Sequence, residues 1–162
     1  MISTELKTTI QGAYSRFLEA KSLKPRYGQR LMIAEIAKVL GDIDTDDEGR
    51  RSGDPAIVAV EAGTGTGKTV AYSLAAIPTA KAAGKRLVIA TATVALQEQI
   101  VYKDLPDLMR NSGLNFTFAL AKGRGRYLCL SKLDVLLQEG HAQTATAQLF
   151  EEEGFKIEVD EA

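Results

Sequence analysis

The sequence has a single cysteine, almost no net charge and no long hydrophobic run. One cysteine, Cys129, excludes an intramolecular disulfide. A formal net charge of −1 gives no general attraction to nucleic acid, so such binding would need a local basic patch. The N-terminus lacks the apolar stretch of a secretory signal, and no apolar run approaches the roughly 20 residues that span a bilayer. We therefore expect a cytoplasmic protein with no membrane contact.

What is present is the composition of a soluble globular protein. Of 162 residues, 45% are hydrophobic and 25% are charged, which is enough apolar material for a core in one domain or part of a larger one. The spacing of apolar residues predicts a first helix, capped by Ser3 or Thr4, that ends near Pro25. It predicts a second helix at about 29–40, and the polar segment 41–55 then predicts a surface loop.

The middle of the chain alternates between short apolar runs and helical patterns. The expected order is strand, helix, strand, helix, strand, at residues 56–60, 67–81, 86–91, 94–105 and 116–120. This order predicts an α/β fold with a parallel sheet, and Pro106 is expected to end the second of these helices. Three strands are fewer than the roughly five or six of a typical sheet, so we expect the sheet to be incomplete in this sequence. Beyond Cys129 the pattern is helical again, at 130–137 and 142–152.

The most informative motif lies between the first expected strand and the helix after it: Ala62-Gly63-Thr64-Gly65-Thr66-Gly67-Lys68-Thr69. Glycines allow backbone N–H groups to approach phosphate oxygens, and the helix N-terminus adds its dipole. Lys68 can reach the β- and γ-phosphates, and the Thr69 hydroxyl can ligate Mg²⁺. A dinucleotide-binding fingerprint is excluded because it needs glycine where Lys68 stands. The motif predicts a bound nucleoside triphosphate with Mg²⁺, and Lys68 and Thr69 as the catalytic side chains.

Two polar segments have both a functional and a structural interpretation. Gln29, with Arg26 and Tyr27 beside it in sequence, carries a donor and an acceptor that could bracket the adenine edge. It would serve equally as a solvent-facing residue at a helix start. Thr91 and Thr93 follow the second expected strand, at the sheet edge where ligands of α/β proteins bind. Their hydroxyls could hold a nucleic-acid phosphate, and Thr93 could also cap the next helix.

The third expected strand leads into a basic, glycine-rich segment: Lys122-Gly123-Arg124-Gly125-Arg126-Tyr127-Leu128-Cys129. Its cations and its tyrosine could bind single-stranded nucleic acid, or the segment could be a solubilising loop. A lone cysteine is usually a small buried hydrophobe, and one thiolate cannot hold an iron–sulfur cluster. The residues alone leave both questions open.

In combination and order, these motifs resemble the DinG-type ATP-dependent DNA helicases, in the iron–sulfur branch of helicase superfamily 2. The motifs that carry the resemblance are Arg26-x-x-Gln29, Ala62–Thr69, Thr91–Ile100 with the later Lys103-Asp104-Leu105-Pro106, and Gly123–Cys129. Alanine at the first position of the loop is common in superfamily 2. The resemblance covers roughly residues 25–133.

The resemblance implies a role for each motif. Gln29, with Arg26 nearby, would recognise adenine, and the loop would bind ATP with Mg²⁺. Cys129 would be one of the four ligands of a [4Fe–4S] cluster. Four side chains would contact DNA: Thr91, Thr93, Arg124 and Arg126. The implied activity is 5′→3′ unwinding driven by ATP hydrolysis, on single-stranded, forked or R-loop DNA, in replication and repair.

The resemblance also implies a division of the chain. Residues 1–24 would form an N-terminal helix, 25–122 the first part of a RecA-like P-loop motor domain, and 123–162 the start of a helical iron–sulfur domain. The further cluster cysteines, the second motor domain and its arginine finger are absent, so we expect an N-terminal piece that hydrolyses little ATP by itself. Residues 157–162 lack the apolar strand before an acidic helicase box, so we interpret them as a surface segment.

Two other classes of protein use the same kind of loop. A small phosphoryl-transfer kinase would carry an acceptor site and a lid in place of the 125–129 segment, and DNA would not stimulate it. A nucleotide-binding interaction module would bind the triphosphate while it folds around a partner. Both classes remain alternatives to the helicase.

Overall fold

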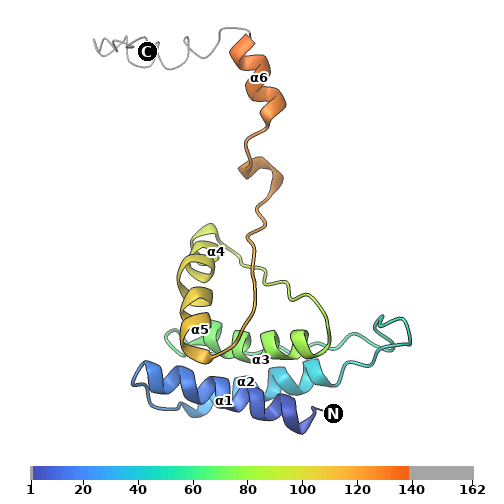
Figure 1. Ribbon diagram of the computed structural model, residues 1–162, viewed down its shortest axis with the longest axis vertical. Helices are drawn as coiled ribbons and strands as arrows, with labels where there is room; N and C mark the ends of the chain where they lie inside the picture. Colours follow the sequence, from blue (N-terminus) through green and yellow to red (C-terminus); the bar gives the residue numbers. More distant parts are fainter. Residues whose placement is uncertain (1, 139–162) are drawn as a thin grey trace. The chain divides into compact units, whose positions relative to one another are not determined.

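The computed structural model describes residues 2–138, and the regular structure within that range is helical (Figure 1). The elements are α1 (Thr4–Ala20), α2 (Tyr27–Gly41), α3 (Lys68–Ala82), α4 (Val94–Gln99), the π-helix η1 (Ile100–Asp104), α5 (Leu105–Ser112), the 3₁₀-helix η2 (Arg124–Arg126) and α6 (Leu130–Gln138). They fall into two compact units, one up to Ala119 and the other from Leu120 onward. Helices α1 to α5 belong to the first unit.

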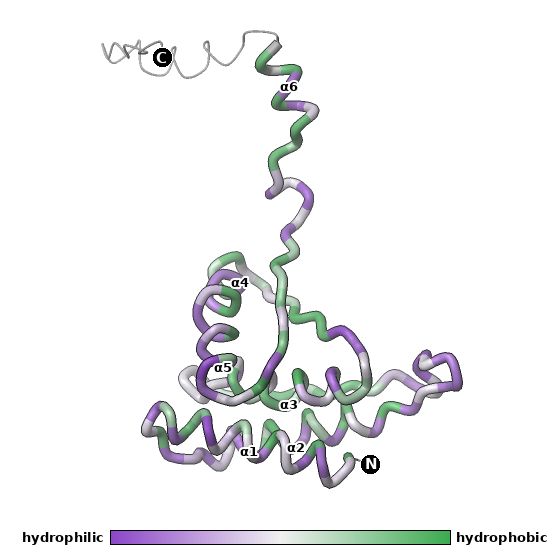
Figure 2. The backbone as a smooth tube through the Cα atoms, in the orientation of Figure 1, coloured by the Kyte–Doolittle hydropathy of each residue, from purple (hydrophilic) through white to green (hydrophobic). Residues whose placement is uncertain are grey.

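The core of the first unit forms where α1, α2 and α3 pack together. Figure 2 shows hydrophobic residues alternating with hydrophilic ones along α1, as expected of a helix with one buried face. Helix α3 is buried over most of its length, and Leu74 within it is completely inaccessible to solvent. Helix α5 packs against α1 and contributes the equally buried Leu108. This packing holds the start of α3 close to α2.

The two predicted N-terminal helices are confirmed, with small differences at their ends. Ser3 is the N-cap of α1, and its Oγ accepts a hydrogen bond from the Leu6 N–H at 3.1 Å. Such a cap satisfies one of the orphan N–H groups of the first turn. Helix α2 begins at Tyr27, two residues before the predicted start at Gln29. The first helix after the phosphate loop is confirmed as α3, which begins at Lys68.

The prediction that the helix from 94 ends at Pro106 is wrong. The chain continues from α4 through η1 into α5, which ends at Ser112 and is followed by Gly113 in the left-handed conformation. In η1 the Leu105 N–H donates to the Ile100 carbonyl, five residues back instead of four. This wider turn places Pro106 at the start of α5, where a missing N–H leaves no gap in the helix.

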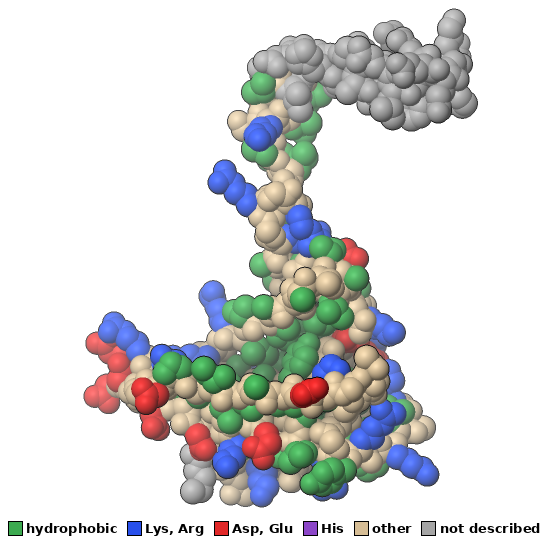
Figure 3. Space-filling model, turned by 180° about the vertical axis from the view of Figure 1, so that it is seen from behind, with side chains coloured by type: hydrophobic (Ala, Val, Ile, Leu, Met, Phe, Trp, Pro, Cys, Tyr) green, Lys and Arg blue, Asp and Glu red, His purple; other side chains and the backbone are tan. Residues whose placement is uncertain are grey.

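The predicted parallel sheet is not confirmed, because residues 2–138 contain no strand. The runs 56–60, 86–91 and 116–120 carry no regular structure, and within the described range the isolated bridge is between Thr45 and Arg51. A run becomes a strand only when a neighbour supplies hydrogen bonds, and parallel strands also need both faces covered. Here Val58 and Val60 are 37% and 42% exposed. On the face that Figure 3 shows, hydrophobic side chains gather around the middle of the view.

The second unit contains η2 and α6, and α6 (Leu130–Gln138) confirms the helix predicted at 130–137. The helix predicted at 142–152 and the final segment 157–162 lie outside the described residues. Within residues 2–138, no helix is both long enough and apolar enough to cross a membrane.

Candidate nucleotide-binding site

The loop Ala62–Thr69 leads directly into α3, and its backbone requires glycine at two positions. Gly65 and Gly67 have φ values of 77° and 79°, in the left-handed region that residues with a side chain rarely adopt. Gly67 is the N-cap of α3 and supplies no side-chain cap. The first N–H groups of α3 are therefore presented at the end of the loop, as a phosphate-binding helix requires.

Gly67 is also constrained by Gln29, which reaches it from α2. Gln29 Nε2 donates a hydrogen bond to the Gly67 carbonyl at 3.2 Å. A Cβ atom on Gly67 would lie 2.5 Å from that nitrogen, which is too close for a real contact. Gln29 is 7% exposed, so the solvent-facing interpretation of this residue is wrong.

Arg26 binds the loop in the same way, two residues earlier. Its Nη1 donates to the Gly65 carbonyl at 2.6 Å. Arg26 and Gln29 therefore hold the carbonyls of the two left-handed glycines. In a trans peptide the C=O and the following N–H point in opposite directions, so these bonds also orient the N–H groups of Thr66 and Lys68. The segment predicted to recognise adenine is thus bonded to the phosphate loop.

Lys68 and Thr66 bond to the first half of the loop. Lys68 Nζ donates to the carbonyls of Ala62 and Gly63 at 2.7 and 2.9 Å. Thr66 Oγ1 donates to the Gly63 carbonyl at 2.7 Å. Lys68 is exposed and its ammonium has three donors, so one remains beyond these two bonds. The cation therefore lies over the loop.

Thr69, the predicted magnesium ligand, lies half-buried in the first turn of α3 beside Tyr72. Burial raises the pKa of Tyr72; the Asp104 carboxylate adds to this, and a hydrogen bond with Thr69 lowers it. Within residues 2–138, no group of three or more His, Cys, Asp or Glu side chains could hold a metal ion. Ligation of Mg²⁺ by the Thr69 hydroxyl together with phosphate oxygens stays a prediction.

Thr91 and Thr93, the predicted DNA contacts, are arranged around the start of α4. Thr93 Oγ1 accepts a hydrogen bond from the Leu96 N–H at 3.2 Å, which makes it the N-cap of α4. Thr91 Oγ1 donates to the Thr93 carbonyl at 3.1 Å. The cap interpretation of Thr93 is confirmed. A role of these hydroxyls in DNA binding stays a prediction.

The predicted basic segment belongs to the second unit. Arg124 and Arg126 lie in η2 and are exposed. The Tyr127 hydroxyl accepts a hydrogen bond from the Lys122 N–H at 2.8 Å, which closes the segment into a turn. Cys129 follows as an exposed thiol, so the interpretation as a buried hydrophobe is wrong. Exposure is compatible with a ligand role, but one thiol does not hold a cluster.

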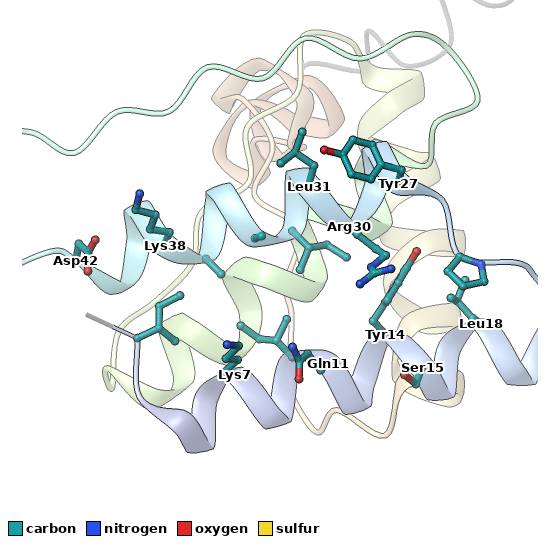
Figure 4. A pocket seen from close by; sticks show the side chains of 16 residues that line it. Lys7, Gln11, Tyr14, Ser15, Leu18, Tyr27, Arg30, Leu31, Lys38 and Asp42 are labelled. Atoms are coloured by element: carbon teal, nitrogen blue, oxygen red, sulfur yellow. The ribbon is translucent and has the colours of Figure 1, made fainter.

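A hollow of about 1270 Å³ lies between α1 and α2 (Figure 4). Lys7 and Gln11 come to it from α1, and Arg30 and Lys38 come from α2. No residue of the phosphate loop lines it. The phosphate loop therefore lies outside this hollow.

Two tyrosines near the loop were not predicted from the sequence as site residues. Tyr14 of α1 donates a hydrogen bond to Gln29 Oε1 at 3.0 Å, and Tyr72 neighbours Thr69. A signal for Tyr14 exists in the sequence, because it lies on the apolar face of α1, four residues after Ile10. A tyrosine buried there needs a partner for its hydroxyl.

Comparison with known proteins agrees with the motifs. A sequence model described as DEAD/DEAH box helicase matches residues 48–149, more than half of the chain, and this match includes the whole loop. Three relatives are each named ATP-dependent DNA helicase DinG. The one from Photobacterium profundum is 39% identical over 161 residues, which is 99% of this chain and 22% of that protein.

The other two relatives are from enterobacteria. The Escherichia coli K12 protein is 40% identical over 136 residues, covering 83% of this chain and 18% of its own length. The Salmonella typhimurium protein is 45% identical over 112 residues, covering 69% and 14%. The chain thus spans about a fifth of the length of these relatives. The resemblance to DinG-type helicases is confirmed, and the kinase and interaction-module alternatives gain no support.

Proposed function

The chain belongs to the DEAD/DEAH box helicase family, and from that premise we propose that it is the ATP-binding part of a DinG-type DNA helicase. One observation carries the proposal. The loop Ala62–Thr69 places Lys68 at the N-terminus of α3, while Arg26, the N-cap of α2, and Gln29 within α2 bind the carbonyls of Gly65 and Gly67. Donors and one cation therefore converge where a triphosphate would lie.

Family membership implies a RecA-like P-loop fold for the first unit. We propose that the apolar runs 56–60, 86–91 and 116–120 are strands of its parallel sheet. Their exposed side chains, such as Ile57 and Val88 at 83% and 86%, need neighbours that residues 2–138 do not supply. The neighbouring strands would belong to the longer protein.

Within the loop, each group has a distinct task. The N–H groups that follow Gly65 and Gly67 would bind phosphate oxygens. The Lys68 ammonium would exchange its bonds to Ala62 and Gly63 for the β- and γ-phosphates, and Thr69 would ligate Mg²⁺. The bound metal supplies charge neutralisation at the phosphates. Hydrolysis also needs a residue that positions water and a cation from a second motor domain, and we place both outside residues 2–138.

Gln29 has fewer free hydrogen-bonding groups for adenine than the sequence predicts, because two are used within the protein. Its Oε1 accepts from Tyr14 and its Nε2 donates to Gly67, which leaves one N–H and one lone pair for the base. Arg26 is bonded to Gly65. Tyr27 is 81% exposed at the start of α2 and could stack on the adenine ring.

Each unit carries residues that we propose as DNA contacts. Thr91 and Thr93 would face the phosphate backbone at the start of α4, and Arg124 and Arg126 would bind phosphates from η2. We propose single-stranded, forked or R-loop DNA as the substrate, with 5′→3′ unwinding in replication and repair. The protein would act in the cytoplasm.

The function is tested by strand separation with the full-length protein. We expect displacement of a strand from a forked duplex with a 5′ single-stranded tail, only with ATP and Mg²⁺, and little displacement from a duplex with a 3′ tail. ATP hydrolysis should rise when single-stranded DNA is added, because nucleic acid and nucleotide act on one motor. ATP hydrolysis that single-stranded DNA leaves unchanged, without displacement, would contradict the proposal.

A [4Fe–4S] cluster is the remaining part of the proposal, and it concerns Cys129. Cys129 is exposed and precedes α6, whose Leu133 N–H donates to the Cys129 carbonyl at 3.0 Å. This sequence has one cysteine, so Cys129 fits the role of a single ligand, and the other ligands would come from the longer protein.

For Cys129→Ser in the full-length protein, we expect loss of the brown visible absorbance and of bound iron and sulfide. Serine removes the thiolate and changes little else at an exposed site. Ser131→Ala, two residues away and also exposed, is the matched control and should keep the colour. Unchanged iron and sulfide in Cys129→Ser would refute the assignment.

A further inference from the structure

Tyr14 is buried on α1 and its hydroxyl joins two hydrogen bonds. The side chain is 8% exposed, and its hydroxyl donates to Gln29 Oε1 at 3.0 Å. The same oxygen accepts from the Arg26 N–H at 3.4 Å. Figure 4 shows Tyr14 extending from α1 toward α2. Tyr14 is thus bonded to both residues that hold the phosphate loop, to the side chain of Gln29 and to the backbone N–H of Arg26.

The two hydrogen bonds of Tyr14 fix which group donates and which accepts in each contact that follows. The Arg26 N–H can only donate, so it faces a lone pair of the Tyr14 oxygen and leaves the phenolic proton for another acceptor. That acceptor is the carbonyl oxygen of the Gln29 amide. The NH₂ group of the same amide then faces Gly67 and donates to its carbonyl. A flipped amide would set its oxygen against the Gly67 oxygen, and two acceptors repel.

The last contact fixes a peptide group that the nucleotide would use. The Gly67 carbonyl accepts from Gln29 at 3.2 Å and from the Ala71 N–H at 3.1 Å. The N–H of Lys68 belongs to the same trans peptide and points in the opposite direction. Gly67 adopts a φ of 79°, where a glycine peptide can rotate more easily than others. The Gln29 bond therefore adds a second restraint, beside the Ala71 bond, to the peptide at the N-terminus of α3.

We propose that Tyr14 is a positioning residue for triphosphate binding: its hydroxyl fixes the Gln29 amide, which fixes the Lys68 N–H. The inference rests on the proposed function of the loop as an ATP site. It differs from base recognition in one respect. A residue that positions the loop affects every ligand with a triphosphate, whereas a residue that recognises adenine affects only ligands with that base.

The test compares ATP and inorganic tripolyphosphate binding to the full-length protein and to Tyr14→Phe. Phenylalanine keeps the buried ring and removes the proton that Gln29 Oε1 accepts. We expect the dissociation constants of both ligands to rise about tenfold, because a buried acceptor has lost its donor. The KM for ATP should rise similarly, with kcat within about twofold of the parent. Tyr102→Phe, at a tyrosine 70% exposed, should match the parent.

A double-mutant cycle shows whether Tyr14 acts through Gln29. In a Gln29→Ala background, Tyr14→Phe should weaken tripolyphosphate binding no further. Equal losses in both backgrounds would overturn the inference. So would a loss for ATP alone, because the effect would then lie at the base, and so would unchanged affinity in Tyr14→Phe. If the parent binds neither ligand, the proposed function fails and this inference with it.

Discussion

Replacement of Lys68 by alanine in the full-length protein is expected to lower the ATP hydrolysis rate by about 10²–10³-fold and to abolish unwinding. The Lys68 ammonium is the cation of the loop, and its Nζ lies within 2.9 Å of two loop carbonyls. It would neutralise charge that builds up on the transferred phosphoryl group, and alanine supplies no replacement. Single-strand DNA binding should change little, because the proposed DNA contacts at Thr93 and Arg124 are separate residues.

The measurement is steady-state ATP hydrolysis with saturating single-stranded DNA, together with DNA affinity in the absence of nucleotide. Lys24→Ala is the matched control, since Lys24 is an exposed lysine between α1 and α2. A Lys68→Ala protein that still unwinds DNA would exclude the phosphate role. Equal losses of DNA binding and hydrolysis would contradict the division of roles between the loop and the DNA contacts.

Gly67→Ala is expected to weaken ATP binding roughly 10²-fold, because the new Cβ both strains the backbone and clashes with Gln29. A side chain at a φ of 79° is strained by about 1–2 kcal/mol. The new Cβ would also lie 2.5 Å from Gln29 Nε2, so the amide must move and release the Gly67 carbonyl. Both changes disturb the peptide that presents the Lys68 N–H.

Binding of a fluorescent ATP analogue measures this effect, and thermal unfolding shows whether the variant is folded. Gly28→Ala is the control, since a Cβ at Gly28 meets nothing within 4 Å. If the clash matters, Gly67→Ala should cost less in a Gln29→Ala background than in the parent. The assignment is wrong if Gly67→Ala binds as tightly as the parent.

The helices could be predicted because their signals are local. The apolar spacing of α1 and its Ser3 cap lie within a few residues of one another, and the same holds for α3 after the glycine loop. The continuation through Pro106 could not be predicted, because it depends on a change of hydrogen-bond register in η1. A strand is not a local property either. The run 56–60 has the right residues, but residues 2–138 give it no pairing partner.

In the candidate site too, the contiguous residues could be predicted from sequence and the contacts between distant residues could not. The octapeptide is contiguous, so its glycines, Lys68 and Thr69 could be named from sequence. The hydrogen bonds that hold this loop join residues far apart in sequence: Tyr14 and Gln29 are 15 residues apart, and Gln29 and Gly67 are 38 apart. These contacts exist only after α1, α2 and α3 have packed. The sequence predicted that Arg26 and Gln29 recognise adenine, and only the structure shows their hydrogen bonds to the loop carbonyls.

The two donors Arg26 and Gln29, at the start of α2, have a consequence for protein engineering. A designer who grafted Ala62–Thr69 onto another strand–helix junction would transfer the glycines and the lysine. The graft would leave behind Arg26 and Gln29, which hold the carbonyls of Gly65 and Gly67 from a separate helix. The smallest portable unit is therefore the loop together with Arg26, α2 and the Tyr14 position. A transplanted octapeptide alone should bind triphosphate weakly, because nothing would hold the carbonyls of its glycines.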